Sequence, residues 1–124
     1  MIRIGKVSSI NENNGTAKVV FLPENIVSND LFILMPFTLG KKAYYMPEIN
    51  ETVVCIQDIN KTGFILGSFY SENRTPSECD KNKIYIDFGD GSKVLYNKAE
   101  KSLNLLCDGE INIIGKKVIV KEIG

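Results

Sequence analysis

Short apolar runs, each ended by Gly, Asn, Asp or Pro, recur along the whole chain of 124 residues. Within most of these runs apolar and polar residues alternate with a period of two, which is typical of strands that bury one face. No stretch of ten or more residues keeps an apolar pattern at helical spacing without a Gly or Pro interruption. The pattern therefore predicts an all-β protein.

Five apolar runs lie within the first seventy or so residues. They cover Ile2–Ile10, Thr16–Leu22, Leu31–Phe37, Glu51–Asp58 and Phe64–Tyr70. A turn ending in Asn14-Gly15 predicts a hairpin between the first two, and Gly5 predicts a bulge or sharp bend in the first strand. Residues 23–30 and 38–50 read as loops. Five short strands with a long connection after the third predict a five-stranded OB-fold barrel, whose closure hides the strand edges.

The composition changes after the fifth run. Residues 71–83 are polar, contain Pro76 and show no apolar rhythm, which indicates a linker. We therefore expect an OB-fold domain over residues 1–72, a linker over 73–83 and a separate C-terminal segment over 84–124.

Five shorter strands are predicted in the C-terminal segment. They cover Ile84–Phe88, Lys93–Asn97, Leu103–Cys107, Ile111–Ile114 and Val118–Lys121. Asp90-Gly91 and Asp108-Gly109 are strong hairpin turns between them. A piece of roughly forty residues seldom buries enough apolar surface to fold alone, unless it has disulfides, a metal or partner chains.

Association with other copies of the chain is the interpretation that this size argument favours. Each short strand has one apolar face that something must cover. The residues expected to face the interior of such an assembly are Ile84, Ile86, Val94, Leu103, Leu105, Ile111, Ile113, Val118 and Val120. The alternative is that the segment folds back on the barrel as the second sheet of a monomeric β-sandwich.

The charge balance and the residue types argue against several classes of function. Lys+Arg and Asp+Glu are balanced at 15 each, so the formal net charge is zero and nucleic-acid binding is not expected. Histidine is absent, which removes the commonest general base and metal ligand. The cysteines Cys55, Cys79 and Cys107 are odd in number and form no CxxC pair, so neither a disulfide framework nor a zinc site is indicated.

Acidic residues supply no catalytic constellation. Glu48 and Glu51 have no base, nucleophile or pocket paired with them, so we interpret them as a solvated loop rim. Asp87, Asp90 and Asp108 stand where turns favour aspartate, and their spacing misses the EF-hand pattern. The sequence therefore predicts a structural protein, not an enzyme, with no catalytic, cofactor-binding or metal site.

Aromatic residues leave a second function open. Tyr44, Tyr45, Phe64, Phe69 and Tyr70 would form a base-stacking platform if the barrel bound single-stranded nucleic acid, as some OB-folds do. Against this, we expect Phe64 and Phe69 to fill the barrel core and the tyrosines to lie at a protein contact. The lysines and arginines nearby are too scattered to form a basic groove.

The first residues, 1–6, lack the apolar stretch and cleavage site of a signal peptide. The longest apolar run, Leu31–Met35, is too short to span a bilayer. We therefore expect synthesis in the cytoplasm.

Several motifs together resemble the phage baseplate assembly protein V family, the central spikes of contractile tails, which are related to the VgrG-like spikes. These motifs are Gly5-Lys6-Val7, Ala17-Lys18-Val19, the stretch Pro47–Val54, the stretch Gly63–Tyr70, and Ile86–Ser92 with Tyr96 after it. Their order covers nearly the whole chain: barrel, polar linker, Asp-Gly-Ser hairpin, alternating strands.

The resemblance implies a homotrimer. Three OB-fold domains would form a collar, and three C-terminal segments would wind into an intertwined trimeric β-helix that serves as a needle. Such a spike joins the tail tube or hub and other baseplate proteins, and helps to pierce the target cell envelope. It would belong to a phage tail, a phage-tail-like bacteriocin or a related secretion machine, assembled into the particle and released extracellularly.

The chain departs from the family pattern at its C-terminal end. Many such spikes hold an iron at a His-x-His tip, whereas this chain has no histidine. We therefore expect no iron tip of that type, and a blunt end that would suit a separate tip protein of the PAAR type. The chain also has no room for the lysozyme domain that some relatives carry.

Overall fold

The computed structural model describes residues 1–124 and consists of strands and loops. It divides into two compact units, Met1–Thr75 and Pro76–Gly124, which are described separately below. None of its elements is a helix that is long and apolar enough to cross a membrane.

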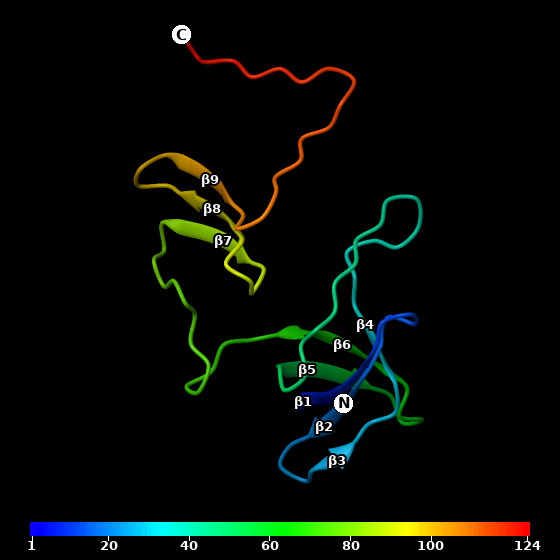
Figure 1. Ribbon diagram of the computed structural model, residues 1–124. Helices are drawn as coiled ribbons and strands as arrows, with labels where there is room; N and C mark the ends of the chain where they lie inside the picture. The colour runs from blue at the N-terminus through cyan, green and yellow to red at the C-terminus, as the bar shows by residue number, and fades with distance from the viewer. The chain divides into compact units, whose positions relative to one another are not determined.

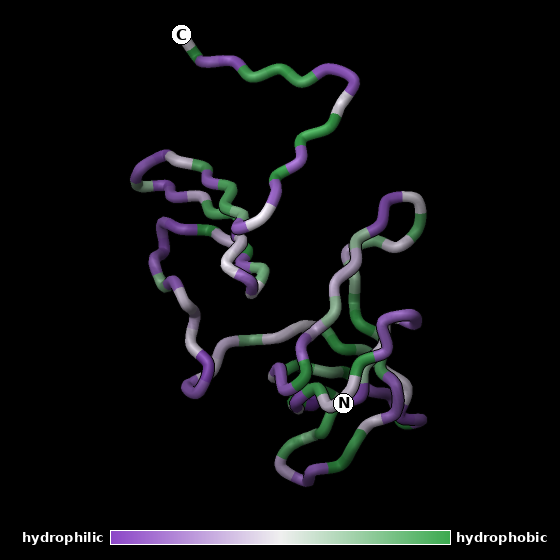
Figure 2. The backbone as a smooth tube through the Cα atoms, viewed as in Figure 1, coloured by the Kyte–Doolittle hydropathy of each residue, from purple (hydrophilic) through white to green (hydrophobic).

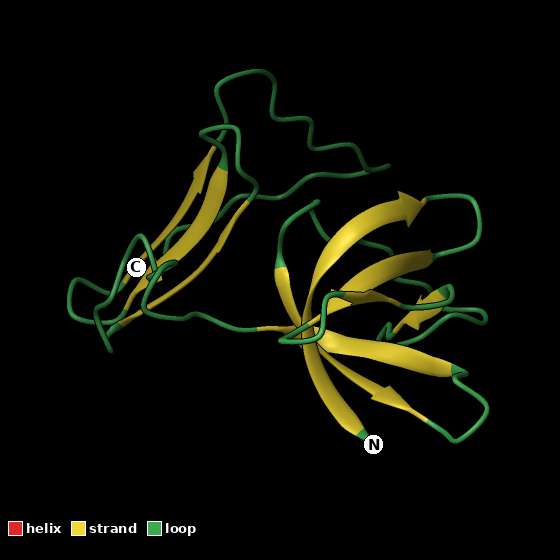
Figure 3. Ribbon diagram, turned by 90° about the horizontal axis from the view of Figure 1, so that it is seen from below, coloured by secondary structure: helices red, strands yellow, loops and turns green.

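The first unit is a closed barrel (Figures 1 and 3). Its strands are β1 (Ile2–Asn11), β2 (Thr16–Phe21), β3 (Ile26–Val27), β4 (Leu31–Ile33), β5 (Thr52–Gln57) and β6 (Gly63–Ser68). They are hydrogen-bonded in the order β1-β5-β6-β4-β2, and β2 pairs back onto β1 to close five strands into a barrel. All pairs are antiparallel except β4 with β6. This all-β, five-stranded closed barrel is consistent with the OB-fold that the sequence predicts.

The sequence placed the strands of this unit well but missed their ends and one short element. The β1–β2 hairpin is confirmed by the antiparallel register that runs from Gly5 opposite Phe21 to Asn11 opposite Thr16. The third strand ends at Ile33 instead of Phe37, before Pro36, which cannot donate a ladder hydrogen bond. Residues 23–30, predicted as loop, contain β3, which pairs with the end of β2.

Alternating residues of the barrel strands build its core. The buried side chains are Val7, Ala17, Val19, Phe21, Leu31, Ile33, Val53, Cys55 and Ile65. On β5, for example, Val53 and Cys55 are buried and Ile56 is exposed, as expected for a strand with one face inside a barrel. Ile10, Met35 and Met46 pack against the same cluster from its margin.

The structural role of Gly5 differs from the one that the sequence predicts. The irregularity in β1 lies between Val7 and Ser9, so the predicted bulge or bend at Gly5 itself is wrong. Gly5 is buried, and a Cβ placed on it would collide with the Val20 carbonyl oxygen and the Val19 side chain on β2. The glycine therefore permits the close approach of the two strands that close the barrel.

Burial of Cys55 makes the barrel sensitive to alkaline pH. Its side chain is fully buried, and desolvation raises the pKa of the thiol from 9.0 to about 11. The unfolded chain loses this proton first, so the contribution to stability is intact below pH 9 and is lost as pH rises towards 11. We expect deprotonation of this single group to lower the free energy of unfolding by on the order of 2–3 kcal/mol between pH 9 and pH 11.

Urea unfolding of the wild type and of Cys55→Val at pH 8 and pH 10.5 measures this effect. All other groups are the same in both proteins, so only the difference between the two pH dependences belongs to Cys55. Equal pH dependences would contradict the assignment.

The second unit contains a three-stranded antiparallel sheet. Its strands are β7 (Lys83–Asp87), β8 (Lys93–Asn97) and β9 (Ser102–Leu106), in that order. Gly89 and Gly91 take positive φ angles of 85° and 93° in the β7–β8 turn. The Asp90 carboxylate accepts a hydrogen bond from the Ser92 backbone N–H at 2.9 Å, which lowers the pKa of that carboxyl group.

Residues after β9 do not form the two further strands that the sequence predicts. Residues 111–114 and 118–121 carry strand-like sequences but belong to no sheet, and every residue from 107 to 124 is exposed. No backbone hydrogen bond joins residues 111–124 to another part of the chain. The predictions of strands at these two places are therefore wrong for the single chain, since a strand exists only when another strand pairs with it.

Candidate assembly surface

The sheet β7–β9 has one almost entirely apolar face, which we call the apolar sheet face. The register places Ile84 opposite Tyr96 and Tyr96 opposite Leu103. It likewise places Ile86 opposite Val94 and Val94 opposite Leu105. Because side chains directly opposite each other point to the same side of a sheet, these residues form two rows of three across the three strands.

Most of this face is open to solvent. Ile84, Ile86, Leu103 and Leu105 are 73%, 62%, 69% and 57% exposed. Val94, on the central strand, is partly buried by its neighbours on both sides. Within residues 76–124, β7 and β9 each pair only with β8, and no further strand lies on the face. Antiparallel sheets commonly bury their apolar face against another layer, so this face is a candidate surface for a partner.

The opposite face of the same sheet is different. It carries polar side chains such as Lys93, Asn97 and Asn104, and the segment before β7 covers part of it. There the Glu78 backbone N–H donates to the Tyr85 hydroxyl at 3.2 Å, and the carboxylate of Glu78 lies 3.4 Å from Lys83 Nζ. The chain therefore covers the mixed polar face with its own linker and leaves the apolar face uncovered.

Five of the nine residues predicted to lie inside an assembly are thus gathered on one surface. The sequence missed Tyr96, which the register adds to the same face. Its spacing of two residues from Val94 was the available signal, because alternate residues of a strand share a face.

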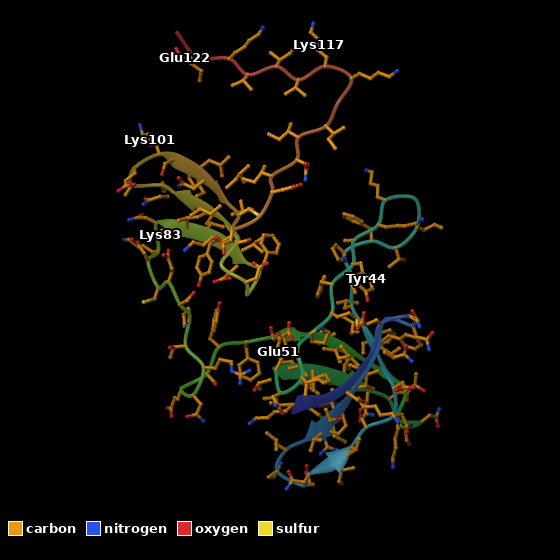
Figure 4. The ribbon with its side chains drawn as sticks, viewed as in Figure 1. Tyr44, Glu51, Lys83, Lys101, Lys117 and Glu122 are labelled. Carbon is orange, nitrogen blue, oxygen red and sulfur yellow. The ribbon has the colours of Figure 1, made fainter.

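The other four predicted interior residues lie in the tail that follows β9. Ile111, Ile113, Val118 and Val120 are 53%, 70%, 53% and 92% exposed and are not paired with the sheet. Figure 2 shows short apolar stretches separated by polar ones along this tail, and Figure 4 marks Lys117 and Glu122 on it. The tail has short apolar runs typical of strands, at residues 111–114 and 118–120, and lacks a neighbouring strand.

Charged side chains that could serve a chemical role in the barrel unit instead form hydrogen bonds with nearby backbone groups. Glu51 Oε1 accepts a hydrogen bond from the Glu48 backbone N–H at 2.9 Å, so these two glutamates tie the loop before β5. The Arg74 guanidinium donates to the Asn50 carbonyl at 3.3 Å in the same region. In the second unit, the Asp87 carboxylate accepts a hydrogen bond from the Gly89 backbone N–H within its turn. No group of three or more Cys, Asp or Glu side chains is placed to hold a metal ion.

The aromatic residues are arranged differently from the sequence prediction. Phe64 and Phe69 do not fill the barrel core: they are 44% and 40% exposed, and Phe64 packs against Phe32 with ring centroids 6.0 Å apart. Phe64 alternates with the buried Ile65 on β6, so it points outward. The Tyr44 and Tyr45 hydroxyls donate to the carbonyls of Glu12 and Leu34, which anchors the long β4–β5 connection. Figure 4 marks Tyr44 on this connection.

Comparison with known proteins adds no family assignment. No protein-family model matches the chain, and no curated protein is significantly similar to it.

Proposed function

We propose that the protein is the structural central spike of a contractile tail or tail-like injection particle, active as a homotrimer. The observation that carries the proposal is the apolar sheet face of β7–β9 together with the strand-like, unpaired tail. Both features call for partner strands. Three copies of a C-terminal segment wound around one another as a β-helix would supply them.

The chemistry of the segment suits such a needle. The six residues of the apolar sheet face would lie inside, with Ile111, Ile113, Val118 and Val120 continuing the interior along the tail. Backbone hydrogen bonds between chains would satisfy the free edges of β7 and β9. Interchain strand pairing along a needle gives stiffness, which is what transmission of a contractile force to a cell envelope requires.

The remaining proposed partners would bind at the barrels and at the tip of the needle. The OB-fold barrels would form the collar that joins the needle to the tail tube, the hub and other baseplate proteins. The chain has no histidine to hold an iron at the needle tip, and a separate PAAR-type tip protein is the partner proposed for that place. The spike would be made in the cytoplasm, built into a virion or tail-like particle and released with it.

The solution mass of the purified chain tests this proposal directly. Sedimentation or light scattering is expected to give three times the chain mass of 13.8 kDa, with a β-only circular dichroism spectrum. A monomer at micromolar concentration would contradict the proposal and favour a monomeric β module. Salt-sensitive binding of single-stranded DNA to that monomer would favour the nucleic-acid function instead.

A further inference from the structure

Three dipeptides of this chain place a glycine directly after an Asn or Asp: Asn14-Gly15, Asp90-Gly91 and Asp108-Gly109. In such a pair the glycine backbone nitrogen can attack the side-chain carbonyl carbon, Cγ, of the residue before it. Glycine favours the attack because it has no side chain to hinder the approach and its backbone turns freely. The surroundings of each pair in the fold therefore decide which pair reacts.

The reaction at an aspartate rearranges bonds and consumes no other reactant. The glycine nitrogen bonds to Cγ and loses its proton, and the carboxyl hydroxyl leaves as water, which closes a succinimide ring. Water then adds back to either ring carbonyl. One opening restores aspartate. The other gives isoaspartate, in which the main chain runs through the side-chain carboxyl carbon and is longer by one methylene.

The Asn14-Gly15 pair is held in the β1–β2 turn. The Gly15 backbone N–H donates to the Asn11 carbonyl at 3.0 Å, and the Asn14 backbone N–H donates to the Asn11 side-chain oxygen at 3.2 Å. Gly15 has a φ of 67°, and the residues on either side of the turn, Asn11 and Thr16, are paired in the barrel. The Gly15 nitrogen must leave this geometry before it can attack, so the turn protects Asn14.

The Asp90-Gly91 pair is restrained through its carboxylate. This group accepts the Ser92 backbone N–H at 2.9 Å, and Ser92 also closes the turn by accepting from the Phe88 N–H at 3.0 Å. Attack on Cγ requires the carboxylate to give up its hydrogen bond. The same bond lowers the pKa of the carboxyl group and so keeps it ionised, without a hydroxyl that can leave.

The Asp108-Gly109 pair has neither restraint. It follows β9, which ends at Leu106, and both of its residues are exposed. The Asp108 carboxylate and the Gly109 backbone N–H make no hydrogen bond within the chain. The nearby bond from the Cys107 thiol to the Glu110 carbonyl, at 3.4 Å, spans the pair and engages neither group. The attacking nitrogen and Cγ are therefore free to approach each other.

We propose that Asp108 with Gly109 is a self-modification site, at which the unassembled chain converts Asp108 to isoaspartate. One part of this inference rests on the proposed function: assembly would order β9 and the tail on both sides of the pair, and so would restrain the Gly109 nitrogen. A chain that reacts before it assembles has an additional methylene between β9 and Ile111. This insertion would shift the tail relative to its partner strands, so the modification marks chains that failed to assemble.

Ageing of the full-length Ile113→Asp variant tests the chemistry in single chains. Residue 113 belongs to no sheet of the chain, and the single-chain fraction is isolated by gel filtration. Isoaspartate is measured by a protein isoaspartate methyltransferase and located by mass spectrometry of peptides. It is expected to form about fivefold faster at residue 108 than at residue 90, the ratio that one hydrogen bond represents. Residue 14 is expected to stay intact.

Two controls assign the difference to the fold. In urea the restraints disappear, and residues 90 and 108 are expected to react alike. Gly109→Ala is expected to remove most of the signal at residue 108, because the new side chain hinders the attacking nitrogen. The substitution fits the structure, since a Cβ on Gly109 would meet only the Cys107 sulfur, at 4.0 Å. As much isoaspartate at residue 14 or 90 as at residue 108 in the folded single chain would overturn the proposed site.

The wild type separates this inference from the proposed function. A three-chain mass with less isoaspartate at residue 108 than in the single chain would support both. A three-chain mass with equal isoaspartate would overturn the protection by assembly and leave the spike standing. A wild type that is monomeric and forms isoaspartate at residue 108 would reject the spike and leave the modification site standing.

Discussion

Val94→Asp is expected to abolish assembly and leave a chain that sediments as a monomer of 13.8 kDa. Val94 stands on the central strand of the apolar sheet face, between Ile86 and Leu105. In the proposed trimer it would lie inside the needle, where a carboxylate would have no partner and little water. Burying an unpaired charge costs several kcal/mol per chain, and three copies would carry it at once. Analytical ultracentrifugation measures the loss directly.

The opposite face of the same sheet offers a matched control. Asn104→Asp adds the same carboxylate on β9, on the side that carries Lys93 and Asn97, and is expected to leave the trimer intact. If both variants lose the trimer equally, sheet stability and not the apolar face is responsible. A trimeric Val94→Asp protein would show that this face does not lie in the interface.

The tail is tested in the same way with Ile113→Asp. Residue 113 belongs to no intrachain sheet, so the substitution disturbs nothing within a single chain. Loss of the trimer would therefore come from the contact between copies. A normal trimer would show that Ile113 does not face the interior.

Gly5→Val is expected to destabilise the barrel by about 3 kcal/mol, as severe overpacking does. The new Cβ would collide with the Val20 carbonyl, a backbone atom that moves only if β1 and β2 separate. These two strands close the barrel, so the collision lies at its seam. Urea unfolding followed by circular dichroism gives the change in the free energy of unfolding.

Gly67→Val is the matched control for Gly5. Gly67 also lies in a barrel strand, but a Cβ placed there would meet no atom within 4 Å. This variant is expected to change the free energy of unfolding by less than about 0.5 kcal/mol. Equal losses in the two variants would show that strand glycines matter for another reason than the close approach at Gly5.

Much of the barrel could be predicted because its strands obey local rules. Alternation identifies a strand such as β5, and Asn14-Gly15 identifies the β1–β2 turn. The short strand β3 could not be foreseen, since two residues carry no periodic signal. Size and hydrophobicity predict Phe64 in the core, but its neighbour Ile65 occupies the inward position. Residue type shows whether a side chain is hydrophobic, whereas only the strand register shows which side of the sheet that side chain faces.

The sequence could predict most residues of the apolar sheet face, but it could not predict whether the tail after β9 forms strands. Alternation placed Ile84 and Ile86 on one face, and the turn at Asp90-Gly91 set their register against β8. Residues 111–114 and 118–121 have strand-like sequences but pair with no strand of the single chain, and only the proposed assembly would give them partners. A sequence records that a segment can be a strand, but the neighbouring strand that completes it can belong to another molecule.

The unpaired tail has a consequence for how the protein comes to be made. The barrel strands end at Ser68, so everything that the barrel requires is synthesised before β7 begins. Because the barrel unit has a buried core of its own, we expect it to fold before chains meet. The tail, under the proposed assembly, becomes ordered only when chains meet, so maturation is a collision-limited step that speeds up with expression level. In the interval the cell holds chains with finished barrels and open apolar edges, the species most exposed to proteases and to aggregation.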